Sequence, residues 1–232
     1  MQADNANGPV LTAVDLSRVF GSGDTAVTAL SGISLTVQQG DFLAVTGRSG
    51  SGKTTLLNLL SGLDSPTTGT VHFHGDDLAN LRESDLVEMR RHKIGFVFQS
   101  FGLMPLLSAQ ENVELPLHIG GASWRERRQK ATEALRAVGL GTRARHRPFE
   151  LSGGEQQRVS IARALVTEPE VVFADEPTGE LDTATARSIA ETLGEVAASR
   201  RATVIVATHD LDLAATAQRR LDLIDGMIVS QG

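Results

Sequence analysis

The sequence predicts an α/β protein in which a mostly parallel β-sheet is flanked by helices. Two observations lead to this fold class. Strand-sized apolar runs alternate with helical stretches along most of the 232 residues. A block of consecutive helices interrupts that alternation in the middle of the chain, which indicates a helical subdomain inserted into the sheet. The length suits one large α/β domain with such an insertion.

The expected elements follow from the chain in order. Two early strands, residues 10–20 and 29–37, are expected to form an N-terminal antiparallel β region. A buried strand over 41–47 runs directly into a glycine-rich stretch, and an apolar face predicts a helix over 53–63. Further buried strands that end in polar residues are expected at 94–99, 171–177 and 202–210.

Between Ser108 and Val166 the pattern becomes one helix after another. We therefore expect a single domain over residues 10–232, preceded by a disordered leader over residues 1–9. Its core is expected to comprise 10–98 and 167–232, with the helical subdomain over 99–166.

Composition excludes several classes of function. The formal net charge of −6 argues against a general nucleic-acid binder, which normally carries a basic excess. The absence of cysteine excludes disulfides, thiolate zinc sites and cysteine nucleophiles. No apolar run approaches the roughly 20 residues that span a bilayer, and the polar start lacks the layout of a signal peptide. A soluble chain of intracellular type is expected.

The stretch GRSGSGKTT fits the phosphate-binding pattern G-x-x-x-x-G-K-[ST], between a predicted strand and a predicted helix. Glycines allow backbone N–H groups to point at phosphate oxygens, and the helix N-terminus adds positive potential. The lysine then reaches the β- and γ-phosphates, while the following hydroxyl ligates Mg²⁺. The alternative, a glycine-rich turn with a chance lysine, does not explain this context. The predicted ATP-binding residues are Gly47, Arg48, Ser49, Gly50, Ser51, Gly52, Lys53, Thr54 and Thr55, with Thr54 also a metal ligand.

The run VVFADEP places two carboxylates at the end of a buried strand. Asp175 is predicted to hold Mg²⁺, often through water, and Glu176 to polarise the water that attacks the nucleotide. An aspartate at this place can also serve only as a helix N-cap. The upstream phosphate-binding loop favours the metal-binding interpretation.

The stretch LSGGEQQR, residues 151–158, is a second helix start that bears glycines. Here the sequence resembles the ATP-binding subunits of ABC transporters, over nearly the whole chain. The resemblance implies that Ser152, Gly153, Gly154 and Glu155 close over the γ-phosphate bound to another protomer. It therefore implies a head-to-tail homodimer that sandwiches two ATP molecules. Alone, the same stretch is an ordinary helix start capped by Ser152.

The resemblance extends to the remaining motifs in order. Phe20 matches the aromatic that stacks on adenine, where relatives usually carry tyrosine, although a strand-end phenylalanine is more often part of a core. Gln99 matches a glutamine that touches Mg²⁺ and the attacking water. His209 matches a histidine that contacts the γ-phosphate, and Asp182 belongs to the interface motif GELD. Glu180 in that motif departs from the small or uncharged residue of relatives, which puts the symmetry of the two ATP sites in doubt.

His72 and His74 stand two apart like a metal pair, but a solvated strand face is the favoured interpretation because a third ligand is lacking.

Three functions remain to be weighed. A soluble ABC-type ATPase acting on nucleic acid or ribosomes would typically carry two cassettes, a long coiled coil or zinc cysteines. Assignment as a kinase or GTPase with a phosphate-binding loop would leave the LSGGEQQR stretch unexplained. The resemblance therefore favours an ATPase subunit that powers a transporter or mechanotransmission complex.

The stretch from Phe98 to Leu117, with ADEPTGELD, resembles the branch of macrolide exporters, lipoprotein-releasing ATPases and haem exporters. Export or extraction of a hydrophobic or peptide-like cargo is expected, since the regulatory C-terminal domain of many importers is not found. The resemblance implies a separate membrane-spanning permease as partner, peripheral attachment to the cytoplasmic face of the cell membrane, and no nucleic-acid partner.

Overall fold

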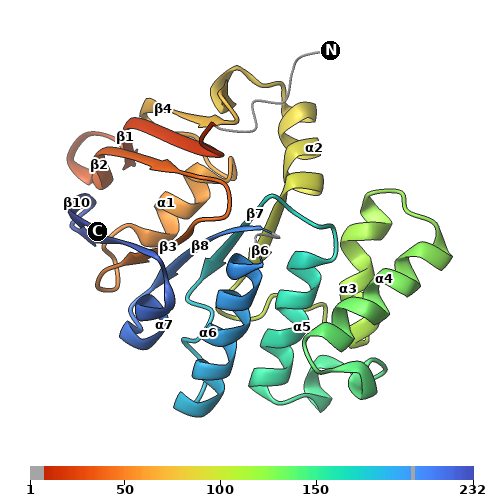
Figure 1. Cartoon of the computed structure of the whole chain (residues 1–232). Coiled ribbons are helices and arrows are strands. Elements are labelled where there is room, and N and C mark those ends of the chain that lie inside the picture. Colours follow the sequence, from red (N-terminus) through yellow and green to blue (C-terminus); the bar gives the residue numbers. More distant parts are fainter. Residues whose placement is uncertain (1–7, 200–201) are drawn as a thin grey trace.

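Two β-sheets, the helices that pack around them and an inserted block of helices form the computed structural model, which describes residues 8–199 and 202–232 (Figure 1). The predicted leader falls outside the described residues except for Gly8 and Pro9. Within the described chain, no helix combines the length and the apolar character needed to cross a membrane.

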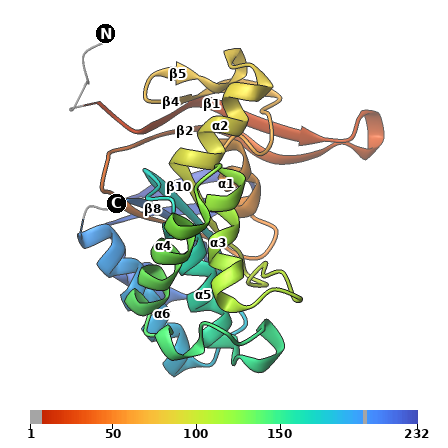
Figure 2. The same ribbon diagram turned by 90° about the vertical axis from the view of Figure 1, so that its right-hand side faces the viewer.

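The N-terminal β region is an antiparallel sheet of four strands in the order β2-β1-β4-β5. The hairpin of the first two strands projects from the molecule (Figure 2). Both were predicted from the sequence, and the second begins two residues earlier than expected. The strands are β1 (Leu11–Phe20), β2 (Val27–Val37), β4 (Thr68–Phe73) and β5 (Asp76–Asp77).

The second sheet has six strands in the order β10-β9-β3-β8-β7-β6. Only the pairing of β10 with β9 is antiparallel, so the prediction of a mostly parallel sheet is confirmed. Its strands are β3 (Phe42–Thr46), β6 (Ile94–Val97), β7 (Val171–Asp175), β8 (Thr203–Thr208), β9 (Arg219–Ile224) and β10 (Met227–Gln231).

Helices pack around these sheets, and α1 lies between the two (Figure 1). The helices that accompany the sheets are α1 (Lys53–Leu60), α2 (Glu83–Lys93), α6 (Thr183–Ala198) and α7 (Leu211–Thr216). The inserted block contains α3 (Ala109–Ile119), α4 (Trp124–Ala137) and α5 (Gly153–Leu165). Short 3₁₀ turns occur at Gly23–Thr25, Leu78–Asn80, Gly141–Arg143 and Pro148–Glu150.

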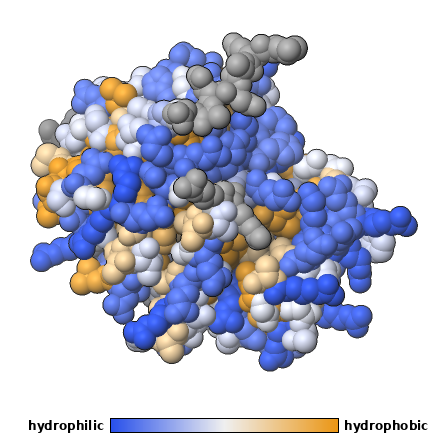
Figure 3. Space-filling model, in the orientation of Figure 1, coloured by the Kyte–Doolittle hydropathy of each residue, from blue (hydrophilic) through white to orange (hydrophobic). Residues whose placement is uncertain are grey.

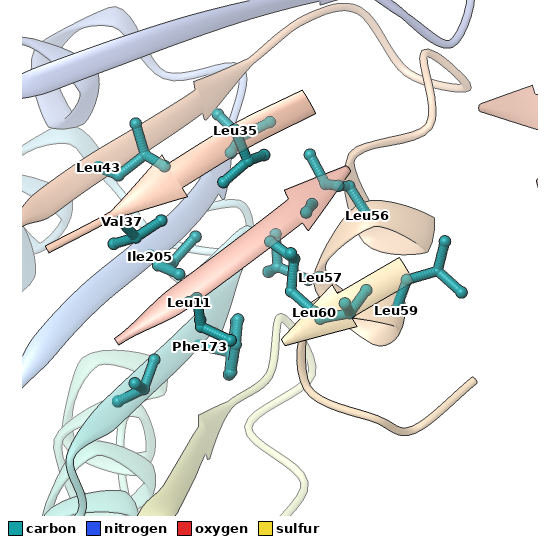
Figure 4. Close-up of a cluster of buried hydrophobic side chains, with 14 of the residues drawn as sticks. Leu11, Leu35, Val37, Leu43, Leu56, Leu57, Leu59, Leu60, Phe173 and Ile205 are labelled. Atoms are coloured by element: carbon teal, nitrogen blue, oxygen red, sulfur yellow. The ribbon is translucent and has the colours of Figure 1, made fainter. Parts of the chain in front are cut away.

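The central strands are buried on both faces because helices or the second sheet cover each side. In β7, Val171 and Phe173 point into the cluster that contains the leucines of α1, as Figure 4 shows for Phe173. Val172 and Ala174 point to the opposite cluster, which includes residues of α5, α6 and α7. Alternate side chains of a strand face opposite sides of the sheet, so one apolar run fills both clusters. Figure 3 shows polar side chains over most of the outer face of this assembly, with smaller hydrophobic groups among them.

The inserted helices have a hydrophobic cluster of their own, built from residues of α3, α4 and α5. The buried amide of Asn112 organises the chain that leads into them. Its nitrogen donates to the carbonyl oxygens of Met104, Leu107 and Ser108, and its oxygen accepts from the backbone of Met104. These bonds satisfy backbone N–H and C=O groups of an irregular loop that lacks the regular hydrogen bonds of a helix or a sheet.

Phe173 gives a direct test of this architecture, because its ring is 1% exposed between the two sheets. We expect Phe173→Ala to lower the free energy of unfolding by about 3–5 kcal/mol, since it removes a large side chain and leaves a cavity. Phe149→Ala is the matched control, because that ring is 75% exposed; it is expected to change stability by about 0.5 kcal/mol or less. Urea unfolding of the two variants compares them, and equal losses would contradict the placement of Phe173.

Candidate nucleotide-binding site

Four parallel strands bring the predicted site residues to one edge of the large sheet. Thr46 of β3 pairs with Thr208 of β8, and Asp175 of β7 pairs with Ala207 of β8. Because carboxyl ends of neighbouring parallel strands lie together, the residues that follow them also meet. Those residues are Gly47, His209, Glu176 and Gln99.

These strand ends border a cavity of about 640 Å³, within the range of small-molecule sites. Seven of the nine predicted loop residues line it, together with Gln99, Glu176 and His209. Gly47 and Ser51 do not line it, but the Ser51 N–H donates to the carbonyl oxygen of Arg48 within the loop. Residues 27–29 of β2 also line the cavity. No sequence signal singled them out, because strand pairing in the other sheet brings them there.

The loop requires glycine at its two ends for steric reasons. At Gly47, φ is 156° and an added Cβ would lie 2.3 Å from the carbonyl oxygen of Leu223. At Gly52, φ is 103° and an added Cβ would lie 2.5 Å from the carbonyl oxygen of Ala29. Both approaches are closer than any side chain permits. The loop therefore runs tightly between β9 and β2, in the way that a phosphate-binding nest needs.

Lys53 opens α1 and lies back over the loop. Its side chain is only 6% exposed, and its Nζ donates to the carbonyl oxygens of Gly47, at 2.8 Å, and Arg48, at 3.2 Å. The same Nζ is 3.2 Å from Oε1 of Glu176. A buried ammonium with these partners is held at the cavity wall, where it can reach phosphate oxygens.

Glu176 has an unusual backbone and a fully engaged carboxylate. Its φ is 45°, in the left-handed region that costs a non-glycine residue on the order of 1 kcal/mol or more. Its backbone N–H donates to the carbonyl oxygen of Ala207 at 2.8 Å. Its Oε2 lies 2.8 Å from Nδ1 of His209 and accepts from the His209 backbone N–H at 3.2 Å. The carboxylate is therefore fixed between Lys53 and His209.

Asp175 and Thr54 form the candidate metal-binding pair. The Thr54 hydroxyl donates to Oδ2 of Asp175 at 2.8 Å, while Oδ1 is buried without a hydrogen-bond partner in the described chain. Burial raises the pKa of Asp175, and the charge of Glu176 adds to this, against the Thr54 hydrogen bond and the Lys53 charge. A hydroxyl and an unpartnered carboxylate oxygen are ligands that suit Mg²⁺. The residues present therefore fit the predicted ion.

Gln99 lies in a loop, because β6 ends two residues earlier than the sequence predicted. It lines the cavity, and an added Cβ on Gly179 would lie 3.3 Å from its Nε2. Over residues 8–199 and 202–232 its side chain makes no hydrogen bond. The structure thus brings Gln99 to the site without joining it to Thr54 or Asp175.

The LSGGEQQR stretch begins α5 with a capping box. The Ser152 hydroxyl accepts from the Glu155 N–H, and Glu155 Oε2 accepts from the Ser152 N–H at 2.8 Å. This backbone hydrogen bond is the main reason that the pKa of Glu155 lies below its usual range. Asp182 caps α6 in a similar way, through the N–H groups of residues 184 and 185. None of Ser152, Gly153, Gly154, Glu155 or Asp182 lines the cavity of its own chain.

Phe20 ends β1, as predicted, and is 43% exposed. It is not among the residues that line the cavity, but its pairing partner Val27 is.

His72 and His74 are not a period-two pair, because β4 ends at Phe73 and His74 has a φ of 50°. Among the described residues no group of three or more histidine, aspartate or glutamate side chains could hold a metal.

The raised pKa of Asp175 predicts how this site affects stability. A folded-state pKa above the unfolded value, about 3.9, means that protonation stabilises the fold below that value. This contribution is lost as the pH rises through the folded pKa. Above the unfolded pKa this carboxyl group is therefore a cost to the nucleotide-free protein, and Asp175→Asn is expected to raise its melting temperature at pH 7. The gain should shrink as the pH falls towards 4.

Asp182→Asn is the matched control. Hydrogen bonds from Thr185 hold the pKa of Asp182 below its usual range, so its charge contributes stability above the unfolded pKa. This variant is expected to lower the melting temperature at pH 7. If both variants shift the midpoint downward in a thermal scan, the electrostatic assignment of Asp175 is wrong.

Comparison with known proteins identifies the family. Residues 30–179 match the family model described as ABC transporter. The chain is 47% identical over 221 residues to the lipoprotein-releasing system ATP-binding protein LolD of Geobacter metallireducens, covering 95% of this chain and 98% of LolD. It is 47% identical over 222 residues to the macrolide export ATP-binding/permease protein MacB of Hyphomonas neptunium. That match covers 96% of this chain and 34% of MacB, so the chain spans about a third of MacB.

Solved structures agree with this. The ATP-binding cassette MJ0796, in a dimeric post-hydrolysis state with ADP and Pi, superposes with a TM-score of 0.88 and 40% identity, covering 96% of this chain and 97% of that one. The chain therefore belongs to the ABC transporter family, as an ATP-binding cassette ATPase homologous to the nucleotide-binding components of membrane transporters.

Proposed function

We propose that this chain hydrolyses ATP with Mg²⁺ at the cavity described above, with Glu176 as general base. The observation that carries the proposal is the Glu176 carboxylate, fixed by Lys53 on one side and His209 on the other while its backbone is in a left-handed conformation. Strained non-glycine residues concentrate at active sites, where the surroundings hold them in place.

We propose a role for each residue of the site. The loop N–H groups and Lys53 bind the phosphates, and Lys53 offsets the charge that grows on the β- and γ-oxygens. Glu176 accepts the proton of the attacking water, and His209 contacts the γ-phosphate. Thr54 and Asp175 would hold Mg²⁺, which would supply positive charge to the phosphate oxygens when it is bound. Gln99 is proposed to touch this ion and the water once nucleotide is present.

The remaining motif residues are proposed to act on the ATP of a second protomer. Ser152, Gly153, Gly154, Glu155 and Asp182 lie outside the cavity of their own chain, yet they form two capped helix N-termini. Such termini offer N–H groups to an anion. A head-to-tail homodimer would bring them over the partner's γ-phosphate, and the similar MJ0796 cassette has been solved as a dimer.

A membrane permease is the proposed partner. Three large apolar side chains are exposed on the segment around and after Gln99: Phe98 at 42%, Met104 at 47% and Leu106 at 79%. Apolar side chains exposed together often mark a protein interface. With the relatives named for macrolide export and lipoprotein release, this supports export or extraction of a hydrophobic or peptide-like cargo. The chain would then work on the cytoplasmic face of the membrane.

This function also assigns roles to the parts of the chain. We propose residues 10–98 and 167–232 as the ATPase core and 99–166 as the subdomain that carries Gln99 and the LSGGEQQR helix. The separate hydrophobic cluster of the inserted helices supports this division.

Glu176→Gln tests the catalytic step. The amide keeps the shape of the side chain but cannot accept the proton, so hydrolysis is expected to fall about 10²- to 10⁴-fold while ATP binding remains. Because ATP bound between two protomers stabilises the dimer, the variant should persist as an ATP-bound dimer. Phosphate release and size-exclusion chromatography with Mg²⁺ and ATP measure both effects. Glu195→Gln, at an exposed glutamate of α6, is the control; an equal loss in both variants would refute the role of Glu176.

Gly153→Asp tests the composite site. A carboxylate at the first turn of α5 suits the helix but repels a partner's phosphate. Like charges facing each other across an interface cost several kcal/mol, so ATPase activity is expected to fall by at least about tenfold. ATP binding to the monomer should be unchanged. Gly153→Ala, which adds a Cβ without charge, should keep most of the activity. Normal turnover in Gly153→Asp would show that this helix closes no site.

Cysteine crosslinking tests the permease partner, since the natural chain has no cysteine. Leu106→Cys is expected to crosslink to a cytoplasmic helix of the permease subunit, in membranes that contain both proteins. Glu195→Cys, on the exposed side of α6, is the control and should not react. Crosslinks at Glu195→Cys and none at Leu106→Cys would place the permease on another face.

A further inference from the structure

The aromatic ring that ends β1 is covered on one side by a cation. The guanidinium carbon of Arg18 lies 4.6 Å from the centre of the Phe20 ring, within the range of a cation–π contact. The ring is 43% exposed at the end of a strand in a hairpin that projects from the molecule (Figure 2). Arg18 thus restricts a side chain that the fold leaves partly exposed.

Arg18 is itself anchored to the helix that begins at the phosphate-binding loop. Its guanidinium donates to Oδ1 of Asp64 at 2.8 Å, and both side chains are about three-quarters buried, with 24% and 28% exposed. Asp64 follows the last turn of α1, where its backbone N–H donates to the carbonyl oxygen of Asn58. The Phe20 ring is therefore connected through two side chains to the element that carries Lys53.

The backbone in this region is held independently of Arg18. The N–H of Thr67 donates to the carbonyl oxygen of Ser17 at 2.8 Å, and the N–H of Val19 donates to the Thr67 hydroxyl at 3.0 Å. These two bonds join β1 to the segment after α1. Loss of the Arg18 side chain would free the ring but leave the strand in place.

We propose that Arg18 is a positioning residue for the nucleotide base: it occupies one face of Phe20 and leaves the other face for a stacked purine. This rests on the proposed nucleotide site. Phe20 pairs with Val27, which lines the cavity, so a base held by the free face would lie beside the phosphate site. A cation–π contact at an exposed site changes affinity about two- to fivefold. Arg18 acts only through the Phe20 ring, so it should contribute to the affinity only of ligands that carry a nucleotide base.

The experiment compares a ligand that has a base with one that lacks it. Isothermal titration calorimetry measures the affinity of the full chain for the non-hydrolysable ATP analogue AMPPNP and for inorganic tripolyphosphate. Arg18→Met keeps an unbranched stem and removes the charge, Arg18→Lys keeps a cation, and Phe20→Ala removes the ring. Arg18→Met is expected to weaken AMPPNP binding about two- to fivefold and leave tripolyphosphate binding unchanged. Arg18→Lys should recover most of the loss.

A double-variant cycle separates positioning from a purely structural role. In the Phe20→Ala background, Arg18→Met is expected to have no further effect on AMPPNP binding. The proposal is overturned if Arg18→Met changes neither ligand, if it weakens both equally, or if the two substitutions add. Failure of the nucleotide site itself looks different: the natural chain would then bind neither AMPPNP nor tripolyphosphate.

Discussion

The parallel register of β3, β8 and β7 is the constraint on which the site depends. Each strand is buried on both faces, so its position is set by two hydrophobic clusters at once. A shift of one residue would move apolar side chains to the wrong cluster and displace the strand end. The distances around Glu176 are therefore set by packing over the whole sheet, and the phosphate-binding loop, Glu176 and His209 stay together without direct covalent or metal links.

A second set of contacts joins the site to the inserted helices. Arg163 of α5 donates to the carbonyl oxygens of Phe101, at 3.1 Å, and Gly102, at 2.5 Å, just after Gln99. Burial lowers its pKa, and no carboxylate pairs with it in the described chain. Ser152 caps the N-terminus of α5, so these hydrogen bonds join the segment after Gln99 to the helix proposed to close the partner's site. The surface proposed for the permease and the surface proposed for the second protomer are thus connected through Arg163.

Local sequence patterns predicted those parts of the fold that depend on local chemistry. The glycine-rich loop, the polar ends of buried strands and the capped helix start at Ser152 all follow from steric or hydrogen-bonding needs of a few adjacent residues. Residues 27–29 escaped prediction because strand pairing over a long sequence distance brings them to the cavity. The contact of Arg18 with Asp64 escaped for the same reason, since 46 positions separate the two residues. Arg18 and Phe20 stand only two residues apart on β1, and their contact was not predicted either. Strand 94–99 was predicted two residues too long, since apolar Phe98 continues the pattern beyond the last ladder pair.

The site combines features that oppose stability with features that serve the reaction. Within the described residues, one buried carboxylate oxygen of Asp175 has no hydrogen bond, and Glu176 next to it has a left-handed backbone. Lys53 offsets part of the negative charge of the two carboxylates. Its Nζ lies 3.2 Å from Oε1 of Glu176 and also donates to two backbone carbonyl oxygens. A divalent cation would offset the excess negative charge of these carboxylates, and Lys53 would attract the phosphates of the nucleotide. Binding of the nucleotide with its metal would give the Asp175 oxygen a partner, although it supplies nothing that removes the left-handed backbone of Glu176. Folding stability and ligand affinity therefore both depend on the Asp175 carboxylate.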